Sequence, residues 1–288
     1  MAPEGLLCRI FIRKQTNRGR GYNVASLEKL RSEIDYLDQE IVKLLERRML
    51  VVTEIMEQKK ELKIPIFDPE REKEVLNKVK KYISYNLFQE EIQSIQQTIM
   101  ESCKKIQSSH LFPYHIYLVG FMGSGKSSVA ITLAEMLAKE SVEMDQLIEN
   151  RYGKSINDIF QEDGEVSFRR TEHELLDDVS AKEDKMIIST GGGVVLSDDN
   201  VNILKNTGVI VWLKASAAET YNRISQSEDR PLLKNNMSLE KITEMLEERN
   251  QYYRSAADFN VETDGKTVKE IGMEIISLLG SVDIEREN

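Results

Sequence analysis

The chain is 288 residues long, enough for one large hydrophobic core or two smaller ones. Its formal net charge of −10 argues against a dedicated nucleic-acid-binding protein, while leaving room for local basic pockets that bind small anions. Cys8 and Cys103 form neither a CxxC pair nor a disulfide framework. No apolar run approaches the roughly 20 residues of a membrane span, and no signal-peptide core opens the chain. These features predict a soluble cytoplasmic protein with no nucleic-acid or membrane partner.

Residues 1–25 form a basic segment in which a single acid, Glu4, accompanies five cations: Arg9, Arg13, Lys14, Arg18 and Arg20. We interpret this segment as a flexible, solvated tail. Its frequent arginines and scarce acids make an organellar targeting peptide the alternative. Neither interpretation bears on the activity of the protein.

A long helix is expected next. From Leu27 to about Leu62, apolar residues recur at alternating three- and four-residue steps with no internal glycine or proline. At about 1.5 Å per residue this helix would exceed about 50 Å, too long to bury its apolar stripe within a small monomer. The pattern therefore predicts that the helix packs against a partner.

Two shorter helices are expected after the long one. Pro65 ends the first helix. Asp68 followed by Pro69 is typical of an N-cap with proline at the first helical position, which predicts a second helix through about Tyr82. Isoleucines at helical spacing predict a third helix over roughly 88–108.

A change of pattern marks a domain boundary near residues 108–114. The sequence SSHLFPY interrupts the helical periodicity, and HIYLVG then begins an apolar strand. We therefore expect a three-helix, all-α domain at 26–108, a linker at 109–114 and a second domain at 115–288.

Cations occupy positions of the long helix where aliphatic residues are expected. Continuing the stripe in steps of seven reaches Arg48, and Lys59, eleven residues further on, shares its face. Arg31 points about 100° away from Arg48. Two inward cations cost several kcal/mol unless anions meet them. A single such arginine more commonly extends to solvent, but for the set we favour a site for an anionic ligand.

Over residues 26–107 the motifs LEKLRSEID, LLERR, DPERE and ESCKKIQ resemble the all-helical AroQ-type chorismate mutases. The resemblance implies an intertwined helical homodimer that rearranges chorismate to prephenate. It assigns eight residues to chorismate binding: Arg31, Arg48, Lys59, Asp68, Arg71, Glu72, Cys103 and Gln107. Asp68 is equally suited to capping its helix. Cys103 stands where the family often has serine, and a weak thiol donor is expected to weaken substrate binding.

The chemistry of this rearrangement suits these residue types. The enzyme must hold a flexible dianion in its reactive conformation and stabilise charge on the ether oxygen of the breaking bond. Arginines such as Arg48 bind carboxylates in bidentate geometry, and by resemblance Arg31 reaches the site of the partner subunit. The resemblance has Lys59 and Gln107 donate to the ether oxygen. Glu72 would bind the ring hydroxyl.

A phosphate-binding loop opens the second domain. Residues 120–127, GFMGSGKS, satisfy the pattern GxxxxGKS/T between an apolar strand (116–119) and a helix (126–139). The Lys126 ammonium would reach the β- and γ-phosphates, and the Ser127 hydroxyl would bind Mg²⁺. The motif predicts a site for ATP and one magnesium ion, formed by Gly123, Ser124, Gly125, Lys126, Ser127 and Ser128.

The rest of the second domain alternates between strands and helices. Continuous apolar segments, MIIST at 186–190 and VIVWL at 209–213, are separated by helical stretches. This alternation predicts an α/β P-loop kinase fold with a buried parallel sheet flanked by helices. Ligands of such sheets bind at the carboxyl ends of the strands, so further site residues are expected there.

Charged residues and glycines occupy those positions: Asp145 in VEMDQLIE, Arg169 in GEVSFRR, Gly191, Gly192 and Gly193 after a strand, Arg230 in DRPLL and Arg249 in EERNQYYR. Taken singly, the aspartate would cap a helix, and Arg169 and Arg249 would be solvated. Three adjacent glycines instead indicate close approach of a ligand. The polar stretch 225–238 around Arg230 is expected to act as a lid.

Together these segments and SINDIF resemble shikimate kinase over residues 115–280. The resemblance implies transfer of the γ-phosphate of ATP to the 3-hydroxyl of shikimate. It assigns Asp145 to the acceptor hydroxyl and its proton. Arg169 and Arg249 would bind the shikimate carboxylate beside the three glycines, while Arg230 would close over ATP and, with Lys126, neutralise charge during transfer.

Two details of the kinase region stay open in the sequence. Phe160 and Phe168 either wall the shikimate pocket or belong to the core. Glu143 with Asp145 replaces the Asp-x-Asp that is common in the family. Glu143 would orient a metal-bound water from one methylene farther away, so we expect an altered Mg²⁺ dependence.

Both resembled reactions belong to the route to aromatic amino acids, so a bifunctional kinase and mutase is the leading interpretation. One alternative makes the helical domain a non-catalytic module that dimerises the kinase or senses chorismate or prephenate. Another gives the kinase a different acceptor, such as gluconate or a nucleoside monophosphate. The paired arginines around the glycines favour shikimate.

Overall fold

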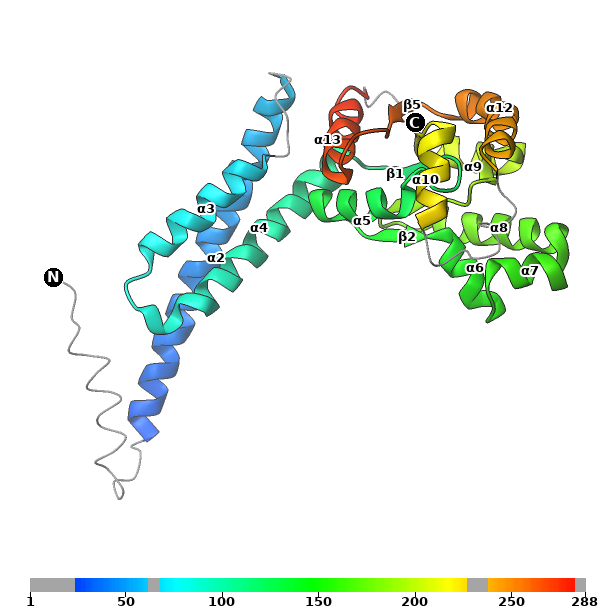
Figure 1. Cartoon of the computed structure of the whole chain (residues 1–288). Helices are drawn as coiled ribbons and strands as arrows, with labels where there is room; N and C mark the ends of the chain where they lie inside the picture. Colours follow the sequence, from blue (N-terminus) through cyan, green and yellow to red (C-terminus); the bar gives the residue numbers. More distant parts are fainter. Residues whose placement is uncertain (1–23, 62–67, 227–237, 283–288) are drawn as a thin grey trace. The chain divides into compact units, whose positions relative to one another are not determined.

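The computed structural model describes residues 24–61, 68–226 and 238–282 (Figure 1). The predicted basic segment 1–25 lies outside the described residues except for its last two positions. Arg230 also lies outside them, with nearly all of the predicted lid.

The chain divides into two compact units, residues 1–54 and 55–288. The first unit contains most of α2 (Val24–Glu61), the long helix that the sequence predicts. The second unit contains the end of α2, all the later helices and the whole of the sheet. Within the described ranges, no helix is both long and apolar enough to cross a membrane.

The second and third predicted helices are present, with a short 3-10 helix between them: α3 (Pro69–Tyr82), η1 (Asn86–Phe88) and α4 (Gln89–Leu111). Asp68 caps α3, because its carboxylate accepts a hydrogen bond from the backbone N–H of Arg71 at 3.0 Å. Helix α4 runs to Leu111, so the first three residues of the predicted linker 109–114 are helical. Burial explains the extension, since Leu111 belongs to the core beside the sheet.

The helical region buries little of its apolar surface within a single chain. Side chains of the α2 stripe keep between 47% and 57% of their accessible surface: Leu27, Leu30, Ile34, Leu37 and Ile41. Helix α3 has no buried residue. Among the side chains described at 26–59 and 68–111, four are buried: Met56, Cys103, Ser108 and Leu111. The apolar stripe of α2 is therefore largely exposed in the single chain.

A five-stranded parallel sheet forms the centre of the kinase region: β1 (His115–Val119), β2 (Ser141–Glu143), β3 (Ile187–Ser189), β4 (Gly208–Lys214) and β5 (Phe259–Glu262). The strand order is β2-β3-β1-β4-β5. The three strands expected from the sequence are β1, β3 and β4. Because β1 and β3 are neighbours, the phosphate loop after β1 adjoins the glycines after β3.

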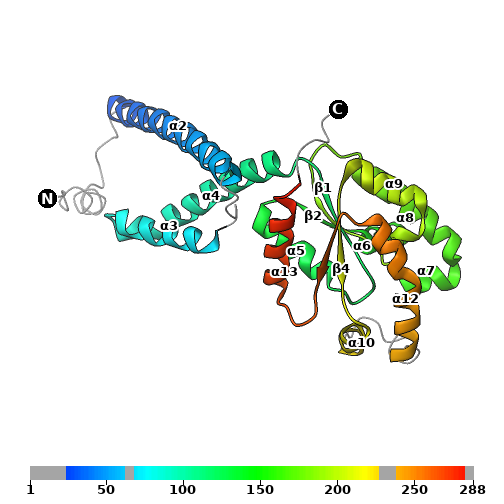
Figure 2. The ribbon, with the colours of Figure 1, turned by 90° about the horizontal axis from the view of Figure 1, so that it is seen from above.

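Helices cover both faces of this sheet (Figure 2). Their bounds are α5 (Lys126–Leu137), α6 (Met144–Tyr152), α7 (Ile156–Glu162), α8 (Gly164–Ser180), η2 (Val194–Leu196), α9 (Asp198–Thr207), α10 (Ala217–Gln226), α12 (Leu239–Ala256) and α13 (Val268–Leu279). Helices α5 and α13 pack on one face, and α8, α9 and α12 on the other. Successive residues of β1 face opposite cores, with Ile116 toward α5 and Tyr117 toward α8 and α9. Burial on both faces explains why the strands are continuously apolar.

Candidate functional site

The phosphate loop connects β1 to α5 and has the backbone that an anion site needs. Gly120, Gly123 and Gly125 have φ angles of 148°, 76° and 93°, which glycine adopts readily and other residues do not. A Cβ atom on Gly120 would also lie 2.5 Å from the carbonyl oxygen of Leu213. Gly125 caps α5 without a side-chain hydrogen bond. The amides of the first turn are thus available to a bound anion.

The predicted ATP-binding residues lie together on this loop and the first turn of α5. Ser124 is buried, whereas Ser127 and Ser128 are exposed at the start of the helix. The Lys126 ammonium donates to the carbonyl oxygens of Gly120 at 2.9 Å and Phe121 at 3.1 Å. These bonds hold the cation against the loop.

Arg223, in α10, is a second cation at the loop, and the sequence analysis missed it. Its guanidinium donates to the carbonyl oxygen of Gly123 at 3.2 Å and to the hydroxyl and carbonyl oxygens of Thr263, both at 3.3 Å. Glu219 accepts from its Nε at 2.8 Å. Arg223 therefore joins the phosphate loop to the segment after β5.

Oxygen donors for a magnesium ion lie beside the loop. Glu143 ends β2, and burial raises its pKa, with the nearby hydroxyls of Ser127 and Ser189 and the charge of Lys126 acting in the opposite direction. Its Oε2 atom is buried and makes no hydrogen bond to any described residue. Mg²⁺ prefers oxygen ligands and keeps several waters, so Ser127 and Glu143 fit the predicted ion, the latter through a water.

The acceptor side of the site is built on the glycines that follow β3. A Cβ atom on Gly191 would lie 2.5 Å from Oε1 of Glu172 and 3.2 Å from Oδ1 of Asp145. A Cβ atom on Gly193 would lie 2.5 Å from Nη2 of Arg169. Glycine is required at positions 191 and 193 because these three side chains approach the backbone so closely. Asp145 and Arg169 therefore both lie beside the glycine triplet.

Glu172 is the residue of this group that the sequence analysis missed. It is 1% exposed and pairs with Arg169 at 2.7 Å. Burial raises the pKa of Glu172, and the charge of Arg169 opposes the rise. Burial acts to lower the pKa of Arg169, but the carboxylates of Glu172 and Glu165 raise it by more. The net shift is upward, so the guanidinium stays charged. The three-residue spacing within FRRTE, which puts both side chains on one face of α8, is the signal that was overlooked.

Arg249, in α12, lies beside Phe121 of the phosphate loop. Its guanidinium lies 5.4 Å from the ring centre of Phe121. One turn later, the buried Tyr253 hydroxyl donates to the carbonyl oxygen of Gly192 at 2.5 Å. Burial raises the pKa of Tyr253 to about 12, while the charges of Arg249 and Arg169 act to lower it. Both arginines thus lie within electrostatic reach of one hydroxyl at the glycine triplet.

The two phenylalanines near the site differ in exposure. Their ring centres are 4.6 Å apart. Phe168 is buried in a small cluster with Ile148 and Ile159, so it belongs to the core. Phe160 is 37% exposed and can face a ligand.

The eight candidate residues of the helical region are divided between the two units. Arg31 is exposed and Arg48 half-buried in the first unit; the other six lie in the second. There, Glu72 pairs with Lys104 of α4 at 3.1 Å, a partner that the sequence analysis did not anticipate. Arg71 pairs with Glu74 at 2.8 Å on the surface. Three of the other candidates are half-buried or buried: Lys59, Cys103 and Gln107.

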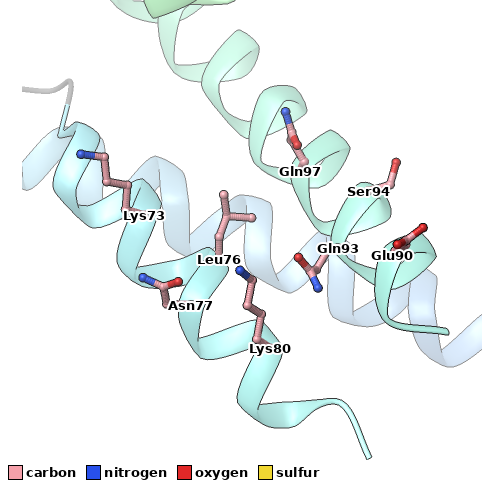
Figure 3. Close-up of a pocket in the computed structure, with 8 residues that line it drawn as sticks. All are labelled: Lys73, Leu76, Asn77, Lys80, Glu90, Gln93, Ser94 and Gln97. Atoms are coloured by element: carbon pink, nitrogen blue, oxygen red, sulfur yellow. The ribbon is translucent and has the colours of Figure 1, made fainter. Parts of the chain in front are cut away.

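A groove of about 530 Å³ lies between α3 and α4 (Figure 3). Its lining is mainly polar: Lys73, Leu76, Asn77, Lys80, Glu90, Gln93, Ser94 and Gln97. None of the eight predicted chorismate-binding residues contributes to this lining. The groove is therefore distinct from the predicted mutase site.

Comparisons with known proteins identify both regions. Residues 122–280 match the family model of shikimate kinase, and residues 30–108 match that of chorismate mutase type II. A shikimate kinase of a Sulfurihydrogenibium species is 41% identical over 163 residues, which cover 57% of this chain and 96% of that protein. One from Geobacter metallireducens is 42% identical over 165 residues, covering 57% of this chain and 91% of that protein.

A solved structure agrees with these matches. Shikimate kinase from Acinetobacter baumannii in complex with shikimate has a TM-score of 0.55 and 32% identity, over 58% of this chain and 92% of that chain. The resemblances that the sequence suggested are confirmed, and the chain is a bifunctional enzyme of aromatic biosynthesis with kinase and mutase activities. It belongs to the shikimate kinase family and carries a chorismate mutase type II domain in front of the kinase.

Proposed function

We propose that the kinase transfers the γ-phosphate of ATP to the 3-hydroxyl of shikimate between the phosphate loop and the glycine triplet. One observation carries this assignment. A Cβ atom on Gly192 would lie 3.5 Å from both the carbonyl oxygen of Gly120 and the amide nitrogen of Met122, so the two loops are in contact. A hydroxyl bound at the triplet is then close to a phosphate bound at the loop. We propose that the phosphate donor is cytoplasmic ATP.

In this proposal Asp145 accepts a hydrogen bond from the 3-hydroxyl and takes its proton as the oxygen attacks the γ-phosphorus. The bond from that phosphorus to the β-phosphate oxygen breaks, and ADP leaves. Arg169 and Arg249 bind the carboxylate of shikimate and orient the ring. Lys126 stabilises charge on the phosphate oxygens, joined in the proposal by Arg230 of the undescribed segment.

Magnesium, when bound, neutralises charge on the β- and γ-phosphate oxygens. Ser127 would hold the ion directly, and Glu143 through a water. The buried, unsatisfied Oε2 atom of Glu143 supports this assignment. One ion per kinase site is proposed.

The kinase assignment is tested by measuring ADP release with MgATP and each of three acceptors: shikimate, gluconate and a nucleoside monophosphate. Turnover is expected with shikimate alone, because its carboxylate matches the arginines at the triplet. Turnover with gluconate or the nucleotide, and none with shikimate, would replace the proposed acceptor. An Arg169→Met variant provides the control. Loss of the guanidinium should raise the KM for shikimate and leave the KM for ATP unchanged.

We further propose that Arg48 and Arg71 bind the carboxylates of chorismate, that Lys59 and Gln107 donate to its ether oxygen, and that Glu72 binds its ring hydroxyl. The contact of Glu72 with Lys104 at 3.1 Å orients its carboxylate. To test this proposal, purified protein is incubated with chorismate, and the prephenate formed is converted by acid to phenylpyruvate and quantified. Prephenate should form with the wild type and not with Arg48→Ala. Chorismate binding without turnover would favour the sensing module instead.

The proposed partner of the α2 stripe is a second copy of the chain. The stripe is apolar and exposed along α2, a helix of 38 residues, and such a stripe is typically covered by a second helix. In a dimer formed through this stripe, Arg31 would reach the partner's site. Sedimentation equilibrium of the full chain should give a dimer, and Ile34→Glu, which places a charge on the stripe, should give monomers. A wild-type protein that sediments as a monomer at micromolar concentration would contradict the proposal.

A further inference from the structure

The end of the helical region nearest the kinase is packed into the kinase core. Met56 near the end of α2 and Phe112 just after α4 are each 1% exposed. Both belong, with Leu111, to the buried cluster formed by β1, α5 and α13. This is the part of the helical region where the buried side chains gather, because α3 has none and the stripe of α2 is exposed.

Hydrogen bonds fix the same join. The Lys139 ammonium, two residues beyond α5, donates to the carbonyl oxygens of Phe112 at 3.0 Å and Lys185 at 3.2 Å. Burial lowers the pKa of Lys139 to about 8, and the charge of Lys185 contributes to the decrease. Three residues separate α4 from β1, and the first of them is buried. The start of this short connection is therefore anchored in the kinase core.

Two proposed mutase donors lie one helical turn from the buried side chains. Lys59 follows Met56 by three residues on α2, and Gln107 precedes Leu111 by four residues on α4. Side chains three or four residues apart occupy the same face of a helix. A displacement of Met56 or Leu111 therefore moves the donor beside it.

We propose that the kinase core positions Lys59 and Gln107, so that Met56 and Leu111 act as positioning residues for the mutase reaction. The inference rests on the roles proposed above for those two donors. Misplacement of a reacting group by about 1 Å lowers rates by up to about 10²-fold. The mutase rate should accordingly depend on the packing of α5, a kinase helix that does not contact chorismate in this proposal.

The test compares two leucine-to-alanine variants of the full-length enzyme that remove the same atoms from the two faces of one sheet. Leu137, on the helix that contacts α4, lies in the cluster with Met56. Leu204, on α9, lies in the opposite cluster. Both are buried, at 4% and 0% exposure. Mutase kcat and KM are measured at a temperature at which circular dichroism shows both variants folded.

Leu137→Ala is expected to lower mutase kcat about tenfold, within the range for a displaced catalytic group, with a smaller change in KM. Leu204→Ala should stay within about twofold of the wild type, and Leu137→Met should restore most of the loss. Equal losses in both alanine variants, or no loss in Leu137→Ala, would overturn the inference. If Leu137→Ala fails to fold, Lys139→Met provides the same comparison, because it removes the bonds to the Phe112 and Lys185 carbonyls; unchanged mutase kcat in that variant would overturn the inference too.

A wild-type enzyme that turns over no chorismate would instead overturn the proposed mutase function, and this inference with it. The assay without substitutions therefore distinguishes the two failures. If the wild type is an active mutase and Leu137→Ala leaves its kcat unchanged, the proposed function stands. Only the positioning role of Met56 and Leu111 is then contradicted.

Discussion

The kinase and helical regions differ in how far they bury their apolar side chains within a single chain. The kinase has a core on each face of its sheet, and its candidate residues converge at the ends of β1 and β3 within one chain. The helical region has an exposed stripe, and its buried side chains lie toward the kinase. One chain is thus enough to place the groups of the kinase site, whereas the mutase site as proposed draws on a second copy and on the kinase core.

The largest expected effect tests whether the kinase site works independently of the mutase. Asp145→Asn removes the proposed proton acceptor and should lower kinase kcat about 10²- to 10⁴-fold, the usual contribution of a general base. Steady-state ADP release checks this value. Mutase activity in the same preparation should be unchanged, and a kinase rate near that of the wild type would show that Asp145 takes no proton.

A second prediction concerns the buried carboxylate that holds Arg169. Glu172→Gln should raise the KM for shikimate about tenfold, as expected when a hydrogen-bonded charge pair is broken next to a bound carboxylate. Glu165→Gln is the matched control, because Glu165 also pairs with Arg169 but is exposed and lies at 3.3 Å. Equal effects of the two substitutions would contradict the special role of Glu172.

The same variant makes a prediction about pH. The pKa of Glu172 is raised above 4.5 in the fold, so the folded state binds this proton more tightly than the unfolded chain does. Ionisation of Glu172 therefore destabilises the fold as pH rises from about 4.5 through the folded-state pKa. Above that range Glu172→Gln should melt at a higher temperature than the wild type while binding shikimate less well. A melting temperature that stays below that of the wild type at neutral pH would show that the pair with Arg169 outweighs burial.

A smaller effect is expected at the metal. Glu143→Asp shortens the carboxylate that would hold a metal-bound water, so the Mg²⁺ concentration for half-maximal kinase rate should change by a few-fold, about the size of one altered hydrogen bond. Titration with Mg²⁺ at saturating ATP measures it. An unchanged titration curve would count against a role for Glu143 at the ion.

The smallest effect is expected at the surface of the helical region. Lys104→Met removes the partner of Glu72, but both side chains are partly exposed, at 20% and 37%, so the pair contributes little in water. Mutase kcat/KM should fall about two- to fivefold, corresponding to about 0.5–1 kcal/mol. Lys105→Met, on the exposed side of the same helix, should have no effect. A loss above about tenfold would mean that the assembled enzyme desolvates the pair.

Much of this architecture was predictable because its signals are local. Asp68 and Pro69 predicted the start of α3, since capping and the fixed φ of proline act within one turn. The phosphate loop was identified for the same reason: its glycines, Lys126 and Ser127 are consecutive, and their backbone angles follow from residue type.

Two of the missed features, the contacts of Arg223 and the extension of α4, depend on residues far apart in the sequence. Arg223 meets Gly123 and Thr263, which are 100 and 40 residues away, and no spacing pattern encodes such contacts. Helix α4 extends past the expected break because Leu111 is buried in a core formed mostly by later strands and helices. Tertiary burial determined that boundary, in place of the local signal.

The central claim is that the mutase site needs two chains and the kinase site one, and mixed dimers test it most directly. Arg31→Ala and Arg48→Ala are prepared separately, then unfolded and refolded together. If Arg31 enters the partner's site, each variant alone is inactive as a mutase, but every mixed dimer has one intact site. With random pairing in a symmetric dimer, mutase activity should recover to about a quarter of the wild-type value, while kinase activity stays at the wild-type level in all samples. A mixture with no more mutase activity than its two components would contradict the account.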